Sequence, residues 1–174
     1  SNRARKHFKG KRKGYFFNAQ PSRQGRVYRR RNRGFPFLQQ MTTCFFEDIE
    51  PFDVSIGLYR RKISYIIDNE GFKEENIVLV FCSDSFLLDL NKKHLDHDYF
   101  TDIITFSYTV NNNISGDLFI SVDRVKENSL KEGVSFEKEL ERVVYHGVLH
   151  LCGYKDKTQK EIKEMRSKEN YYLH

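Results

Sequence analysis

The sequence predicts an α+β domain in which helices pack on a small mixed sheet of about four strands. Strand-like and helix-like segments follow one another in the order strand, helix, strand, helix, two strands and then helices, which is typical of this class. A length of 174 residues with 39% apolar content suits one domain with its own core. No apolar run reaches the roughly 18 residues that a membrane span requires, so we expect no membrane partner.

Charge divides the chain after residue 40. Residues 1–40 contain 13 Lys and Arg and no acidic residue, which leaves 17 basic and 24 acidic residues in 41–174, or +13 against −7. Because 1–40 lacks apolar periodicity, we expect it to be a disordered extension. Three origins stay open: sequence foreign to the domain, an RNA-binding arm, or a transit peptide. We expect residues 41–174 to form the single folded domain.

The first elements of this domain follow from apolar patterning. Residues 42–47 (TTCFFE) are β-prone and short, which favours an edge strand. Asp53 can then cap a helix that reaches about Asn69. Residues 76–82 (NIVLVFC) form a continuous apolar run between polar residues, which predicts a buried strand.

The second half predicts two strands and four helices. We expect a helix capped by Ser83, followed by a polar loop at 94–100 that lies over the active cleft. An antiparallel hairpin of strands at 103–110 and 117–121 comes next. Three helices follow: a short one from Asp123, a central one from Phe136 and a terminal one over 158–172. The central helix carries the residues that point to a function.

His146 and His150 lie four residues apart in an apolar, helix-period segment, so both imidazoles project from one face and can bind one metal ion. Gly147, inside the same helix, costs about 1 kcal/mol relative to Ala, which indicates close contact of the backbone or approach by a ligand. Gly153 is a helix-ending residue, and the turn there can return Asp156 towards the histidines. A His, His, Asp set with an open position is typical of a catalytic zinc site.

A second interpretation of the pair stays open at this point. Buried histidines are often hydrogen-bonded core residues, and pairs four residues apart also arise by chance. The HExxH metalloprotease motif does not apply, because Gly147 follows His146. Cys152 is rotated by about 200° from His150 around the helix, so we expect it to face the core. With an odd number of cysteines in apolar contexts, we expect reduced thiols and a cytoplasmic protein.

Three ordered segments resemble one family. Residues 146–154 (HGVLHLCGY), the Leu90–Asn91 pair with residues 101–106 (TDIITF), and residues 116–121 (GDLFIS) are similar to blocks of the YbeY family. Its members are metal-dependent endoribonucleases of ribosomal RNA maturation. The resemblance runs from Met41 to about Tyr172, which is nearly all of the predicted domain.

The resemblance implies a single-strand-specific, metal-dependent endoribonuclease that acts in ribosomal RNA maturation, including the 3′ end of small-subunit RNA, and in ribosome quality control. Its partners would be precursor ribosomal RNA and the small ribosomal subunit or a ribosomal protein. One divalent ion, zinc, would be held by His146, His150 and Asp156. The catalytic residues would be His146, His150 and Asp102, with Thr101 shaping the site.

The sequence departs from the family pattern twice. Asp156 stands where the family usually has His, although carboxylate oxygen is an accepted zinc ligand. Leu95 stands where the family tends to carry an Arg that contacts RNA phosphate. The candidates to replace that Arg are Lys92, Lys93, His94 and His97. Leu95 and the charge of −7 favour a second hypothesis, a non-catalytic, metal-containing ribosome-assembly factor that binds RNA or a ribosomal protein.

Overall fold

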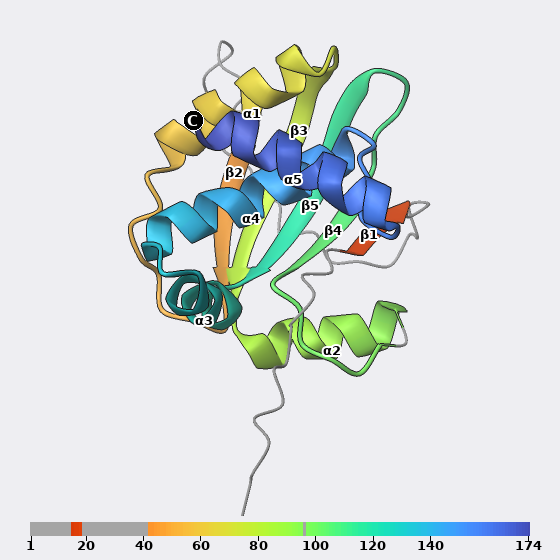
Figure 1. Cartoon of the computed structure of the whole chain (residues 1–174). Helices are drawn as coiled ribbons and strands as arrows, with labels where there is room; N and C mark the ends of the chain where they lie inside the picture. The colour runs from red at the N-terminus through yellow and green to blue at the C-terminus, as the bar shows by residue number, and fades with distance from the viewer. Residues whose placement is uncertain (1–14, 19–41, 96) are drawn as a thin grey trace, which may run out of the picture.

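The computed structural model describes residues 15–18, 42–95 and 97–174. It contains one five-stranded mixed sheet with the strand order β1-β4-β5-β3-β2 (Figure 1). The strands are β1 (Tyr15–Asn18), β2 (Thr42–Glu47), β3 (Lys73–Cys82), β4 (Ile103–Ser107) and β5 (Asn113–Ser121). The β4–β5 pair is antiparallel and the other three pairs are parallel. The α+β class and the edge position of the strand at 42–47 are thus confirmed.

Four of the strands come from the predicted domain and one comes from the basic extension. No strand is predicted before residue 42. The structure differs: Tyr15–Asn18 pairs with β4, and Tyr15 lies opposite Ile104. The remaining predictions for residues 1–40, and Met41 itself, lie outside the described residues.

Helices cover both faces of the sheet. The larger core joins the sheet to α1 (Ile56–Asn69), α3 (Val122–Glu132), α4 (Phe136–Leu151) and α5 (Gln159–Leu173). In Figure 1, α5 lies over α4 as an outer layer. The remaining helix, α2 (Asp84–Leu95), lies away from α4 and α5 and forms a smaller core with β4 and β5. None of the helices among the described residues is long and apolar enough to cross a membrane.

Side chains of β5 alternate between these two cores. Leu118 and Ile120 belong to the larger core, while Phe119 packs against the smaller one. Successive side chains of a strand point to opposite faces, so burial on both faces needs apolar residues at consecutive positions. The run Leu118, Phe119, Ile120 meets this requirement, and it fixes the sheet between α4 and α2.

The helix that carries the histidines lies very close to the sheet. A Cβ atom added to Gly147 would stand 2.6 Å from Ile103 Cδ1 and 2.6 Å from Leu118 Cδ2. The glycine is therefore a contact surface for two core side chains, and close backbone contact was one of the two reasons expected for it. This contact sets the distance between α4 and the strands β4 and β5.

Several boundaries differ from the prediction by a few residues. Helix α1 begins at Ile56, because Asp53 uses its carboxylate locally, accepting a hydrogen bond of 2.9 Å from the Ser55 amide. The turn of the hairpin lies earlier in the chain than expected: β4 ends at Ser107 and β5 already begins at Asn113. The predicted cap Ser83 is confirmed, since its Oγ accepts from the Phe86 amide at 3.1 Å.

Candidate metal centre

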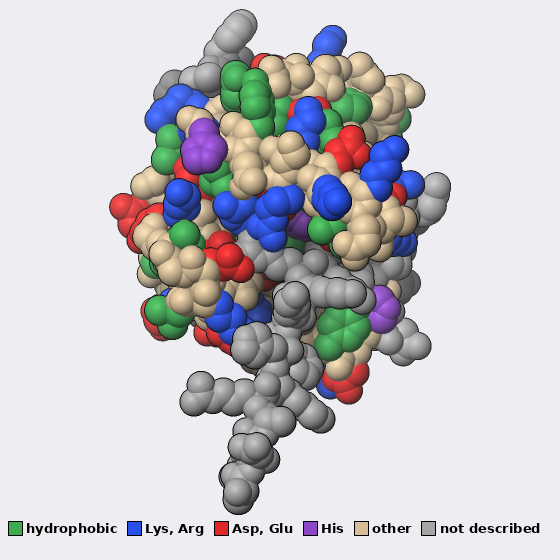
Figure 2. Space-filling model, in the orientation of Figure 1, with side chains coloured by type: hydrophobic (Ala, Val, Ile, Leu, Met, Phe, Trp, Pro, Cys, Tyr) green, Lys and Arg blue, Asp and Glu red, His purple; other side chains and the backbone are tan. Residues whose placement is uncertain are grey.

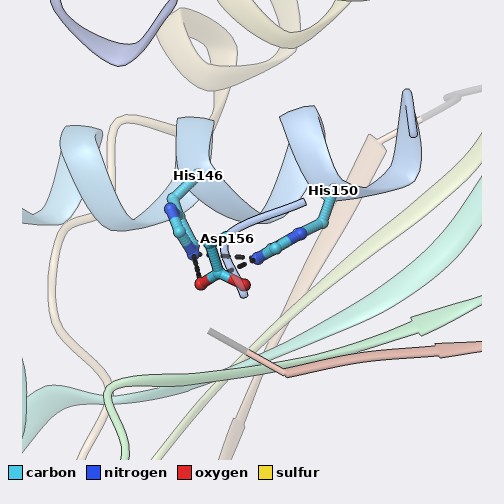
Figure 3. A group of neighbouring side chains, drawn as sticks. All are labelled: His146, His150 and Asp156. Carbon is cyan, nitrogen blue, oxygen red and sulfur yellow. Dashed lines mark hydrogen bonds and ion pairs between the residues drawn. The ribbon is translucent and has the colours of Figure 1, made fainter. Parts of the chain in front are cut away.

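The end of α4 and the loop after it bring three ligand-bearing side chains together. His146, His150 and Asp156 each offer one ligand atom, and these atoms all lie within 4.8 Å of one another (Figure 3). The turn that returns Asp156 passes through Gly153, whose φ of 99° lies in the left-handed region that glycine adopts without strain. The sequence predicted this convergence from spacing and from one glycine.

His150 is 1% exposed and is held by the backbone of the same loop. Its Nδ1 lies 2.9 Å from the carbonyl oxygen of Tyr154. A carbonyl oxygen can only accept, so Nδ1 carries the proton and Nε2 presents its lone pair. The Tyr154 hydroxyl in turn donates to Glu70 at the end of α1, at 2.7 Å, which anchors the loop.

His146 is held from the other side by a carboxylate of α5. Its Nδ1 lies 2.7 Å from Oε1 of Glu169, which is only 5% exposed. The second oxygen of Glu169 accepts from Arg142 at 3.2 Å and from Arg166 at 3.3 Å. As at His150, the partner at Nδ1 leaves Nε2 to face the centre of the group.

The two Nε2 atoms face each other at 2.9 Å. Two neutral imidazoles that both donate through Nδ1 would oppose lone pairs at this distance, so the arrangement is stable only with a cation between the rings. In the protein without metal, that cation is a proton; with metal, both nitrogens are ready ligands. Together with the Asp156 oxygen, which lies within 4.8 Å of both nitrogens, this geometry suits a metal site.

Only one of the two rings readily holds that proton. Burial opposes the charged form of His146, but the hydrogen bond and charge of Glu169, with Asp102 and Asp156, outweigh burial and raise the pKa of His146. Burial and the neighbouring His146 lower the pKa of His150 to about 3. Beyond the two protons on Nδ1, the pair thus carries at most one more near neutral pH, and that additional proton is all that a metal ion must displace.

The donor set fits zinc. With Zn–N and Zn–O bonds near 2.0 to 2.1 Å, tetrahedral ligand atoms lie about 3.3 Å apart. Here the Nε2 atoms are 2.9 Å apart, and Oδ2 of Asp156 lies 3.7 Å from His146 Nε2 and 3.8 Å from His150 Nε2. Two imidazoles and one carboxylate suit a divalent ion such as zinc and, in a tetrahedral site, leave a position for a substrate or water.

Asp102 lies beside the ligand group without being part of it. It is 9% exposed and lines a hollow of about 10 Å³ together with His146, Arg142 and Glu169. Asn128 Nδ2 donates to its Oδ2 at 3.4 Å. The neighbouring Thr101 is also buried, and its hydroxyl donates to the Ile103 carbonyl at 3.3 Å. Asp102 thus lies beside His146, and the roles of Asp102 and Thr101 stay predictions.

The residues proposed to replace the family Arg belong to another part of the fold. Leu95 is the last residue of α2. Lys92 forms an ion pair of 2.9 Å with Asp98, and His97 Nδ1 lies 3.2 Å from the Tyr99 hydroxyl. Their described partners are thus residues of the loop that follows α2.

Glu169 and Arg142 were missed by the sequence analysis. The helical spacing of Glu169 with Met165 and Tyr172 could have indicated it. These three residues form the buried side of α5, and a buried carboxylate requires a partner. Cys152 was placed correctly, since it is buried in the larger core and is not one of the three grouped ligands.

An α+β domain that brings two histidines and one carboxylate together in this way belongs to the class of proteins with a candidate metal centre. Residues 51–174 match the family described as endoribonuclease YbeY. An endoribonuclease YbeY of Flavobacterium johnsoniae is 51% identical over 108 residues, covering 62% of this chain and 78% of the relative. One of Cytophaga hutchinsonii is 43% identical over 138 residues, covering 78% and 96%.

A solved structure agrees with these relatives. The solution structure of a Thermotoga maritima protein aligns with a TM-score of 0.55 and 26% identity, covering 75% of this chain and 87% of that one. The chain belongs to the endoribonuclease YbeY family. The family name denotes RNA-cleaving hydrolases.

Replacement of Asp156 tests the third ligand. We expect Asp156→Ala to weaken zinc binding at least about tenfold, because the open position and the two histidines remain but one anionic donor is lost. The fold should be unchanged, since Asp156 lies on a loop outside the core. Zinc titration in competition with a coloured chelator measures the effect. A variant that binds zinc as tightly as the parent would show that another residue supplies the third ligand.

Proposed function

We propose that this protein is a zinc-dependent, single-strand-specific endoribonuclease that matures ribosomal RNA, including the 3′ end of small-subunit RNA, and that serves ribosome quality control in the cytoplasm. The observation that carries the proposal is the convergence of His146, His150 and Asp156 in a chain of the endoribonuclease YbeY family. RNA cleavage is the activity that the family name states.

The roles of the residues follow from their surroundings. A divalent ion bound at this site supplies a Lewis acid for a phosphate oxygen and lowers the pKa of a water molecule. His146 and His150 present neutral Nε2 atoms because their Nδ1 protons are engaged by Glu169 and Tyr154. Asp102 lines the hollow beside His146, and its proposed role is to hold a proton or orient a water molecule during cleavage.

Charge around the site supports an RNA substrate. The described domain is acidic as a whole, yet Lys and Arg side chains gather on the face crossed by α4 and α5 (Figure 2). Exposed cations of α5 and the loop before it are Lys155, Lys157, Lys160, Lys163 and Arg166. Segregated positive charge of this kind attracts phosphate even when the net charge is negative.

The partners would be precursor ribosomal RNA and the small ribosomal subunit or one of its proteins. The test of substrate class uses one labelled fragment spanning the 3′ end of precursor small-subunit RNA, presented alone and annealed to its complement. We expect the zinc-loaded protein to cut the single strand and to leave the duplex intact. Equal cleavage of both forms would contradict single-strand specificity.

Leu95 favours a second candidate, a ribosome-assembly factor that holds metal and binds RNA or a ribosomal protein without cutting. In that case the zinc-loaded protein would bind the same single strand and leave it whole. The cleavage assay therefore separates the two functions.

A further inference from the structure

Glu169 is a buried carboxylate beside the metal position that contacts three side chains, although it is not one of the grouped ligands. It is 5% exposed, and its two oxygens serve different partners. Oε1 contacts His146 Nδ1 at 2.7 Å, while Oε2 accepts from the two guanidinium groups of Arg142 and Arg166. These anchors come from α4 and α5, so the carboxylate is held on both sides.

The position of this carboxylate decides which nitrogen of His146 is available. A neutral imidazole has one N–H, and the other nitrogen is the only one that can bind a metal. An acceptor at Nδ1 keeps the proton there, which leaves Nε2 as the ligand. The same task at His150 is performed by a backbone carbonyl, which no side-chain substitution removes.

Without Glu169, the two histidines would have a competing arrangement. The Nε2 atoms lie 2.9 Å apart, which is hydrogen-bond distance. A His146 whose proton moved from Nδ1 to Nε2 would donate directly to His150 Nε2. That hydrogen bond would occupy both metal-binding nitrogens, and restoring the metal-binding tautomer would leave a buried Nδ1–H without an acceptor.

We propose that Glu169 is a positioning residue of the metal centre: it holds a proton of His146 on Nδ1 and so leaves Nε2 as the nitrogen that binds the metal ion. Arg142 and Arg166 fix the carboxylate in the orientation that this task needs. The inference rests on the proposed metal site and adds a residue of α5, 23 positions after His146, to it. Partners of this kind typically contribute ten- to a hundredfold to metal affinity.

A purely structural role for Glu169 makes a different prediction. If the residue served only to join α5 to α4, any replacement that kept the helices together would bind metal like the parent. Glu164→Gln removes a carboxylate from the exposed side of the same helix and leaves every contact of Glu169 in place. This variant is the matched control.

The experiment titrates the metal-free full-length protein with cobalt(II) and follows the visible absorption of the bound ion. We expect Glu169→Met, which keeps the size but removes the acceptor, to bind cobalt ten- to a hundredfold more weakly. Glu169→Gln keeps an acceptor oxygen and should restore most of the affinity. The Glu164→Gln control should bind like the parent. Parent-like affinity of a folded Glu169→Met would overturn the inference, and a parent that binds no cobalt would overturn the metal site itself.

A second measurement needs no substitution. Nitrogen-15 NMR of the zinc-loaded parent reports which ring nitrogen of His146 carries the proton. We expect a protonated Nδ1 with slow hydrogen exchange, because the N–H donates to Glu169, which is 5% exposed. A His146 that binds zinc through Nδ1 would overturn the inference even if Glu169→Met did not fold.

Discussion

Replacing His150 with Ala is expected to lower zinc affinity by more than about a hundredfold. Loss of a partner of a ligand already costs ten- to a hundredfold, and His150 is itself a proposed ligand. Its side chain is 1% exposed, and its Nε2 lies 2.9 Å from that of His146. Neither of the other two grouped ligands, His146 and Asp156, can replace it, because each already occupies its own ligand position.

The matched control is His94→Ala, which removes an exposed imidazole from α2. Competition titration should show parent-like zinc affinity for this control. Far-ultraviolet circular dichroism of both metal-free variants checks that the fold is retained. If His150→Ala bound zinc like the parent, the ligand set would have to be found elsewhere in the chain.

Adding a single methyl group to Gly147 is expected to destabilise the fold. The new Cβ would lie 2.6 Å from two core side chains, Ile103 and Leu118, and extra carbon atoms in a filled core typically cost about 1 to 3 kcal/mol. Alanine also gains up to about 1 kcal/mol of helix propensity over glycine, so the overlap must exceed that gain. We expect a net decrease in the free energy of unfolding.

Gly57 provides the matched control, because it lies in α1 and a Cβ added there meets nothing within 4 Å. Gly57→Ala should leave the free energy of unfolding unchanged or raise it by up to about 1 kcal/mol. Denaturant unfolding of the metal-free proteins measures both. The same change in stability for the two variants would show that α4 does not depend on close contact with the sheet.

The elements that could be predicted from sequence are those whose signal is local. The apolar run at 76–82 predicts a buried strand, and β3 contains it: Ile77, Leu79 and Phe81 belong to the larger core and Cys82 to the smaller one. The four-residue spacing of His146 and His150 predicts a shared face, and the structure has it. Helix α4 begins at the expected Phe136 because Ser135 caps it, accepting from the Lys138 amide.

The parts that could not be predicted depend on contacts between distant segments. Glu169 meets His146 only because α5 lies over α4, and nothing near Glu169 in sequence indicates that partner. Strand β1 pairs with β4 across 85 or more residues, which local propensity in a basic segment does not reveal. The sequence left two possible reasons for Gly147, close backbone contact or approach by a ligand, and only its contact with Ile103 and Leu118 distinguishes them.

The central claim is that His146, His150 and Asp156 form a metal centre that cleaves RNA. The most direct measurement is cleavage of a labelled single-stranded ribosomal RNA fragment by the zinc-loaded protein, by the protein treated with chelator, and by the treated protein resupplied with zinc. His150→Ala, purified identically, is run beside them. We predict cleavage that chelator abolishes, that zinc restores and that the variant lacks. Cleavage of equal extent in the variant, or cleavage that survives removal of the metal, would contradict the account.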